Sequence, residues 1–72
     1  MELNAIHTIY FVGIGGIGMS ALARYFRRQG VRVHGYDRTA SALTSVLEQE
    51  GMVIHYVDDP SQIPSGVDLA VY

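Results

Sequence analysis

The sequence predicts an α/β fold, a Rossmann-like doubly wound parallel sheet of about four strands in the spatial order 3-2-1-4. Short apolar runs rich in β-branched and aromatic residues alternate with segments whose apolar residues have helical spacing. A glycine-rich turn, residues 13–18, joins the first apolar run directly to the first helical segment. Glycines follow both helical segments, at the position of left-handed C-caps. This alternation is typical of parallel strands joined by right-handed crossovers, with helices on both faces of the sheet.

The first half of the chain predicts a strand, a helix and a second strand. Residues 6–12 form an almost continuous apolar run, which indicates a buried first strand. The helix is expected to begin at Gly16 or Gly18 and to end at Gln29. The apolar residues expected on its sheet-facing side are Met19, Leu22, Ala23 and Phe26. Residues 31–36 are then expected to form the second strand.

The second half predicts another helix and two short strands. The helix is expected over residues 41–50, with either Thr39 or Ser41 capping its start. Its inner face should comprise Leu43, Val46 and Leu47. A third strand is expected over residues 52–56 and a fourth over residues 67–72, with one short helical turn in the loop between them.

Doubly wound domains usually continue past a fourth strand to a further helix and strand. We therefore expect residues 1–72 to be a truncated fragment of such a domain. Strand 67–72 would then form an apolar edge with unpaired backbone groups. This edge predicts that the isolated chain forms a homodimer, by strand pairing or by exchange of elements.

The composition argues against several classes of function. The chain has no cysteine, so it forms neither disulfides nor thiolate zinc sites. Its net charge of −2 provides no electrostatic footprint for nucleic acid or an anionic membrane. It also has no lysine, so chemistry that requires lysine must come from elsewhere. Residues 1–4 lack the basic segment of a secretion signal and no apolar run has transmembrane length, which predicts a cytoplasmic protein without membrane insertion.

The glycine-rich turn predicts a phosphate-binding site. Helix N-termini expose unpaired N–H groups with partial positive charge, so they favour anions. In such turns the first glycine (Gly13) makes the tight turn, the second (Gly15) lets backbone approach a pyrophosphate, and the third (Gly18) allows close packing of helix and strand. The Ser20 hydroxyl has two open interpretations, a phosphate contact or a hydrogen bond to the backbone.

Asp37 is a second candidate binding residue, because it ends the second strand 19 residues after Gly18. A carboxylate at this position accepts hydrogen bonds from a ribose 2′-hydroxyl in dinucleotide-binding folds. The spacing therefore suits an NAD-binding domain and a uridine nucleotide-binding domain equally well. The competing interpretation of Asp37 is a turn or helix-capping residue.

The remaining polar residues predict neither a catalytic nor a metal site. His7, His34 and His55 lie on different expected strands without metal-ligand spacing. The arginines of the first helix are expected to form a solvated face that complements the helix dipole. No nucleophile–base pair or carboxylate pair stands out in the sequence. We therefore predict a segment that binds and does not catalyse.

The segment Phe11–Ala23, with its core Gly-Ile-Gly-Gly-Ile-Gly-Met-Ser, resembles the N-terminal domain of the Mur ligases. The resemblance continues through Gly35-Tyr36-Asp37 and through Val67–Val71, and it covers nearly the whole chain in matching order. Two departures concern the expected uridine pocket. Tyr36 stands where the family often has serine, and Val57-Asp58 stands where it commonly has Gly-His.

The resemblance implies an ATP-dependent ligase that adds L-alanine to UDP-N-acetylmuramate in peptidoglycan biosynthesis, with Mg²⁺ neutralising the phosphates. Residues 1–72 would be a fragment of its UDP-binding domain, and the ATP-binding and C-terminal domains would lie outside them. The residues expected at the UDP phosphates are Gly13, Gly15, Gly16, Ile17, Gly18 and Ser20. Those expected at the uridine are Asp37, Arg38, Thr39 and Ser41. The fragment alone is expected to bind UDP-N-acetylmuramate weakly at best.

The alternative is an NAD(H)-binding module of a dehydrogenase or a transport regulator. Gly13, Gly15, Gly18 and Asp37 satisfy its fingerprint equally well. Gly16 and the Met19–Ala23 continuation are features that this fingerprint does not require, and they favour the ligase interpretation.

Overall fold

The computed structural model describes residues 5–72, whose strands are all parallel in the order β3-β2-β1-β4. The elements are β1 (Thr8–Val12), α1 (Ile17–Arg28), β2 (Arg32–Tyr36), α2 (Ala42–Gln49), β3 (Val53–His55), the 3₁₀ helix η2 (Pro60–Gln62) and β4 (Leu69–Val71). The predicted strand order is confirmed, and the bounds of each α-helix and strand fall within two residues of those expected. The expectation about residues 1–4 lies outside the described residues.

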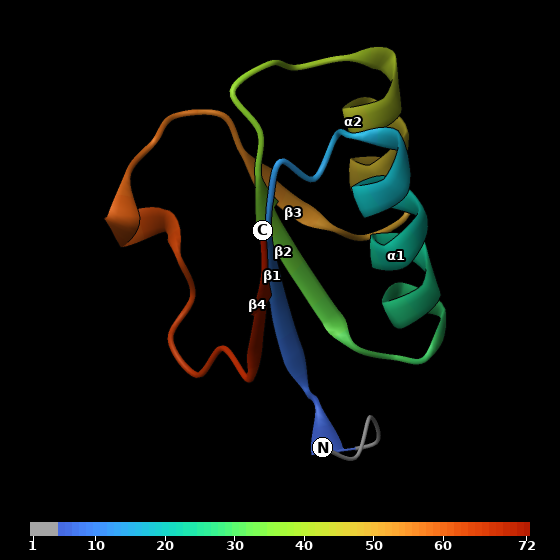
Figure 1. The fold of residues 1–72 in the computed structure, drawn as a ribbon, viewed down its shortest axis with the longest axis vertical. Coiled ribbons are helices and arrows are strands. Elements are labelled where there is room, and N and C mark those ends of the chain that lie inside the picture. Colours follow the sequence, from blue (N-terminus) through green and yellow to red (C-terminus); the bar gives the residue numbers. More distant parts are fainter. Residues whose placement is uncertain (1–4) are drawn as a thin grey trace.

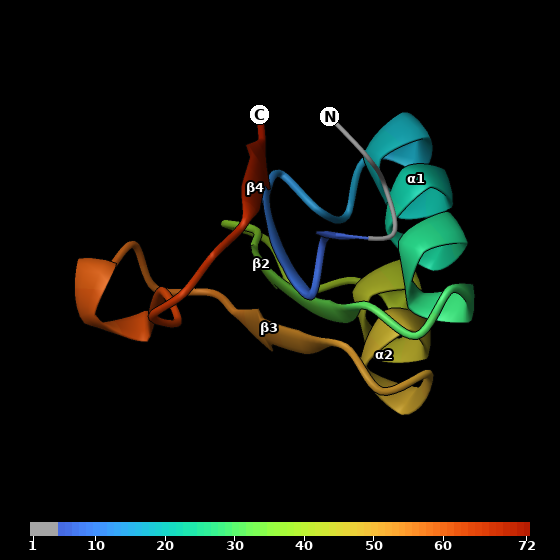
Figure 2. The ribbon, with the colours of Figure 1, turned by 90° about the horizontal axis from the view of Figure 1, so that it is seen from below.

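The two α-helices lie on the same face of the sheet (Figures 1 and 2). The opposite face carries the connection between β3 and β4, which contains η2. From β1 to β2 to β3 the chain adds strands in one direction across the sheet. Because these crossovers have the same handedness, both helices lie on one face, and the connection back to β4 runs across the other face. Helices were expected on both faces of the sheet. On the second face the β3–β4 connection contains only the 3₁₀ helix η2 and no α-helix.

The core lies between the sheet and the two α-helices. Its buried apolar residues are Ile6, Ile9, Phe11, Ile14, Ala23, Phe26, Val31, Val33, Leu47 and Met52. Two residues expected on the inner helix faces are half-exposed instead, Leu22 at 39% and Val46 at 38%. Ser20 and Thr44 are buried in their place. Ala23, Phe26 and Leu47 are buried as expected, so the predicted inner faces depart from the structure only at Leu22 and Val46.

Ser41 is the residue that caps α2. Its Oγ accepts a hydrogen bond from the Thr44 N–H at 3.1 Å, and its own N–H donates to Thr44 Oγ1 at 2.8 Å. This reciprocal pair is a capping box, which satisfies two backbone donors that the helix leaves free. Of the two predicted caps, the structure therefore selects Ser41 rather than Thr39.

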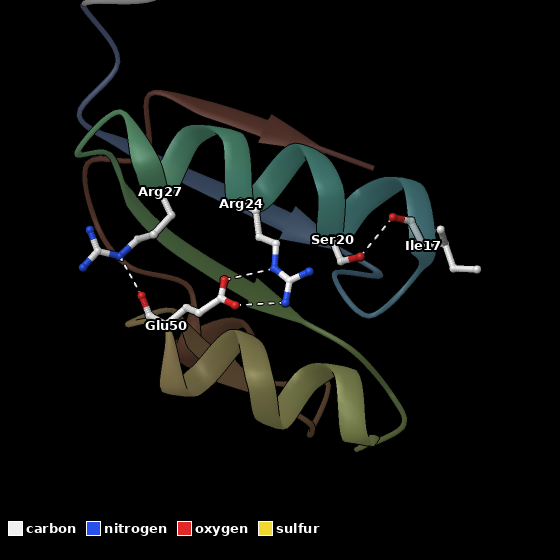
Figure 3. A network of polar contacts seen from close by, with 5 residues as sticks. All are labelled: Ile17, Ser20, Arg24, Arg27 and Glu50. Carbon is white, nitrogen blue, oxygen red and sulfur yellow. Dashed lines mark hydrogen bonds and ion pairs between the residues drawn. The ribbon is translucent and has the colours of Figure 1, made fainter.

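A polar network joins α1 to the end of α2 (Figure 3). Arg24 donates two hydrogen bonds to the Glu50 carboxylate, at 3.0 and 2.9 Å, and Arg27 Nε donates to the Glu50 carbonyl oxygen at 3.2 Å. The pairing with Glu50 raises the pKa of Arg24 and lowers the pKa of Glu50. Arg27 and Arg28 are exposed, as expected for a solvated face, and Arg24 is half-buried. The sequence did not predict that Arg24 and Arg27 also bridge the two helices.

Asp68 fastens the start of β1 to the segment before β4. Its Oδ2 accepts hydrogen bonds from the backbone N–H groups of His7 at 2.8 Å and Thr8 at 3.0 Å. Its own N–H donates to the Thr8 carbonyl oxygen at 2.9 Å. The two backbone donors lower the pKa of the Asp68 carboxyl group, because they stabilise its charged form.

The Asp68→Asn variant is expected to be less stable than the unaltered chain at neutral pH. A pKa that is lower in the folded state stabilises the fold above the unfolded pKa of about 3.9, and this contribution is lost as the pH falls through the folded pKa. Urea denaturation between about pH 7 and pH 2 should therefore show a steeper loss of stability for the unaltered chain than for Asp68→Asn. Parallel pH profiles would contradict this role of Asp68.

Candidate nucleotide-binding site

The glycine-rich turn joins the carboxyl end of β1 to the start of α1 and is fixed to the end of β2. The N–H groups of Gly13 and Ile14 both donate to the Tyr36 carbonyl oxygen, at 2.8 and 3.1 Å. The Gly16 N–H donates back to the Gly13 carbonyl oxygen at 3.1 Å. Gly13 has a φ of +80°, which side chains rarely tolerate. The predicted tight turn at Gly13 is confirmed.

Ile14 anchors this turn in the core. Its side chain is fully buried and lies directly over Gly35 in the middle of β2. A Cβ atom on Gly35 would come within 2.6 Å of Ile14 Cδ1 and 2.9 Å of Ile14 Cβ. This contact between Ile14 and Gly35 was not predicted from the sequence. The signal was available, since a glycine inside a strand often marks a close approach of another chain segment.

The start of α1 presents backbone donors without protein partners. The N–H groups of Ile17, Gly18 and Met19 donate to no acceptor among residues 5–72, whereas the Ser20 N–H bonds the Gly16 carbonyl oxygen at 2.8 Å. No acidic residue lies in the first turn of the helix. Free N–H groups and the helix dipole together make this end suitable for an anion such as a phosphate.

Gly15 and Gly18 have surroundings that the sequence did not predict. A Cβ atom on Gly15 would come within 2.8 Å of Asp37 Oδ2 and 2.9 Å of Thr44 Cγ2, so protein atoms already fill that side. A Cβ atom on Gly18 would meet nothing within 4 Å, so the prediction that Gly18 permits close packing of helix and strand is wrong. Gly15 is needed for contact with Asp37 and Thr44.

Of the two interpretations of the Ser20 hydroxyl, the structure shows the hydrogen bond to the backbone. The hydroxyl is buried and donates to the Ile17 carbonyl oxygen at 2.9 Å (Figure 3). Its side chain therefore supports the first turn of α1 from the inside. Ile17, in contrast, is 88% exposed at the mouth of the turn.

Asp37 connects the glycine turn to the loop that leads into α2. Its Oδ2 accepts the Gly15 N–H at 2.8 Å, and its Oδ1 accepts the Thr39 N–H at 3.0 Å. Arg38, Thr39 and Ser41 are exposed in this loop. The structure thus brings the residues expected at the phosphates and those expected at the uridine to the same end of the sheet.

The three histidines do not converge. Tyr10 Oη lies 2.7 Å from His55 Nε2, and His55 Nδ1 lies 2.8 Å from the Val57 carbonyl oxygen. Because a carbonyl oxygen only accepts, the neutral imidazole that satisfies both contacts is the tautomer with its proton on Nδ1, which accepts from Tyr10 at Nε2. Burial and the neighbouring Arg32 and His55 lower the pKa of His34.

Residues 5–72 offer no grouping of three or more His, Cys, Asp or Glu side chains that would hold a metal ion. No helix in the same range has the length and apolar character needed to cross a bilayer. A hollow of about 370 Å³ lies at the opposite end of the sheet, between the starts of β1 and β2 and the end of α1. The hollow and the glycine turn lie at opposite ends of the sheet, so we do not assign the nucleotide to the hollow.

Comparison with known proteins identifies relatives of this chain. Residues 8–72 match the family described as Mur ligase family, catalytic domain. The chain is 55% identical over 64 residues to UDP-N-acetylmuramate–L-alanine ligase of Cytophaga hutchinsonii, and 59% identical over 64 residues to that of Flavobacterium psychrophilum. It is 58% identical over 65 residues to the ligase of Flavobacterium johnsoniae.

These alignments cover 89%, 89% and 90% of the chain. In each case the chain spans only 14% of the length of the relative. The family match includes the glycine turn, Asp37 and all four strands. The chain belongs to the Mur ligase family.

Proposed function

We propose that this chain is the UDP-binding segment of an ATP-dependent ligase that adds L-alanine to UDP-N-acetylmuramate in peptidoglycan biosynthesis. The observation that carries the proposal is that the N–H groups of Ile17, Gly18 and Met19 have no acceptor among residues 5–72, in a chain of the Mur ligase family. The relatives named above, all UDP-N-acetylmuramate–L-alanine ligases, support the choice of substrate. The proposed place of action is the cytoplasm.

In this proposal the diphosphate of UDP lies against the start of α1. The residues proposed for the phosphate site are Gly13, Gly15, Gly16, Ile17, Gly18 and Ser20, and we add Met19 because its N–H has no acceptor among residues 5–72. Within this set, Ile17 and Gly18 contribute donors and Ser20 supports the helix turn through its bond to Ile17. Asp37, Arg38, Thr39 and Ser41 form the side of the site that faces the uridine.

ATP and Mg²⁺ do not fit the residues of this chain. The sequence has no lysine and no Gly-x-x-x-x-Gly-Lys-Ser/Thr phosphate loop. Residues 5–72 also have no grouping suited to a metal ion. We therefore propose that ATP, Mg²⁺ and L-alanine are bound by parts of the ligase outside residues 1–72, and that this segment holds one substrate without catalytic residues of its own.

Titration of the chain with UDP, uridine and inorganic phosphate tests the proposed site. Nitrogen–proton correlation NMR should show that UDP shifts the amide signals of residues 17–19 and of residues 37–41. Uridine should shift mainly the second group, and phosphate mainly the first. UDP shifts confined to other parts of the chain would refute this placement.

We also propose that the isolated chain forms a homodimer through β4. This strand pairs only with β1 among residues 5–72, so its other edge leaves backbone groups open to a second strand. Sedimentation equilibrium should show a dimer at high protein concentration. A monomer throughout the concentration range would refute the proposal.

A further inference from the structure

We infer that the Asp37 carboxylate is a positioning group that holds the glycine turn against the loop before α2, and that it supports nucleotide affinity through the turn rather than by accepting hydrogen bonds from the ribose. The inference rests on the proposed function, since it concerns the same nucleotide site. It assigns Asp37 a role different from the one its spacing suggests.

Asp37 makes hydrogen bonds to two different loops and to the neighbouring strand. Its two carboxylate oxygens accept from different segments, Oδ2 from Gly15 at 2.8 Å and Oδ1 from Thr39 at 3.0 Å. The Asp37 N–H donates to the carbonyl oxygen of His55, at the end of β3, at 3.2 Å. The side chain therefore links two loops while its backbone is held by the sheet. Hydrogen bonds to a charged acceptor are among the stronger ones in proteins.

Gly15 packs closely against Asp37 and Thr44. Thr44 is fully buried in the first turn of α2, where its Oγ1 accepts the Ser41 N–H at 2.8 Å. Its Cγ2 would lie 2.9 Å from a Cβ atom on Gly15, and Asp37 Oδ2 would lie 2.8 Å from the same atom. Gly15 thus lies between a carboxylate and a methyl group, and the methyl group belongs to a fully buried side chain.

The hydrogen bond between Gly15 and Asp37 determines which backbone donors are left for the phosphates. Because the Gly15 N–H is already bonded to Asp37, the donors left for a diphosphate are those of Ile17, Gly18 and Met19. A free carboxylate beside a diphosphate would be repelled, and its two N–H partners offset that charge. Asp37 thus fixes the turn from which α1 begins, and the direction of the three donors depends on that turn.

The test compares two Asp37 variants with a matched control in the 72-residue chain. Asp37→Ala removes both acceptors and Asp37→Asn keeps one. Asp68→Asn changes another carboxylate that accepts two backbone N–H groups, at the opposite end of the sheet. Dissociation constants are measured for UDP, 2′-deoxy-UDP and 3′-deoxy-UDP, and urea denaturation confirms that each variant is folded under these conditions.

Asp37→Ala is expected to weaken all three ligands by the same factor, roughly tenfold, because the loss lies in the turn. Asp37→Asn should weaken them less, and Asp68→Asn should leave all three affinities unchanged. In the ligand-free chain, the Gly15 and Thr39 amide signals should shift strongly in Asp37→Ala and stay in place in Asp68→Asn. A loss confined to ligands that carry the 2′- or 3′-hydroxyl would overturn the inference, as would unchanged affinities in folded Asp37→Ala.

Failure of the proposed function has a separate signature. If the unaltered chain bound neither UDP nor its deoxy forms, the nucleotide site and the effect of Asp37 on affinity would both be refuted. The ligand-free amide signals of Gly15 and Thr39 would still decide whether Asp37 holds the two loops together.

Discussion

Replacing Gly15 with valine is expected to abolish measurable UDP binding by this chain. The first added atom would meet Asp37 Oδ2 at 2.8 Å and Thr44 Cγ2 at 2.9 Å, and valine adds two further methyl groups. Thr44 is fully buried, so the glycine turn and the Asp37 carboxylate must shift instead. A shift of the turn would displace the start of α1 and with it the N–H donors of residues 17–19. Isothermal titration of the folded variant with UDP measures this loss.

The Gly15→Val variant is also expected to lose roughly 1–3 kcal/mol of stability, as overpacked sites do. Loss of binding must therefore be separated from loss of fold. Asp68→Asn provides the comparison, because it also weakens the fold while its contacts lie at the other end of the sheet. UDP affinity that stays unchanged in folded Gly15→Val would show that the nucleotide binds elsewhere.

Replacing Gly35 with alanine is expected to lower the free energy of unfolding by roughly 1–3 kcal/mol. The added methyl group would come within 2.6 Å of Ile14 Cδ1, in a core position where Ile14 is fully buried. Gly35 lies inside β2, where its neighbours Phe11 and Ile54 in the adjoining strands prevent the backbone from moving away. Urea denaturation measures the change.

A double-mutant cycle with Ile14→Ala identifies the cause of that loss. Ile14→Ala alone should cost roughly 2–5 kcal/mol, because it leaves a cavity. The double variant should be more stable than the sum of the two single losses predicts, since the alanine at position 35 would occupy part of that cavity. Strict additivity would mean that Gly35 is required for a reason other than its contact with Ile14.

The helices, strands and sheet order were predictable from the sequence because their signals are local. The apolar periodicity and the glycines after each helix indicate where elements begin and end, and short crossovers leave few arrangements of four parallel strands. Which side of each helix would be buried was harder to predict from the sequence. Leu22 and Val46 are half-exposed, whereas the smaller, polar Ser20 and Thr44 are buried, which apolar periodicity does not predict.

The position of the candidate site was also predictable, but the contacts within it were not. The glycine spacing indicates a turn at the carboxyl end of β1 and leaves unspecified what lies beside each glycine. The partners of Gly15 are Asp37, which directly follows β2, and Thr44 of α2, and the partner of Gly35 comes from the turn itself. Such contacts depend on how three segments converge, which no spacing along one segment encodes.

Asp37 illustrates this limit most clearly. Its 19-residue distance from Gly18 is compatible with NAD and with a uridine nucleotide. Its contacts with Gly15 and Thr39 add a role within the protein that the distance does not contain. The choice of nucleotide therefore depends on the family to which the chain belongs and on direct measurement.

The most direct measurement is a parallel titration of the unaltered chain with UDP-N-acetylmuramate and with NADH, followed by nitrogen–proton correlation NMR. We expect saturable shifts at the amides of residues 15–20 and 37–41 with UDP-N-acetylmuramate, and none at these positions with NADH. Saturable shifts of the same amides with NADH alone would contradict the assignment of this glycine turn to a uridine nucleotide.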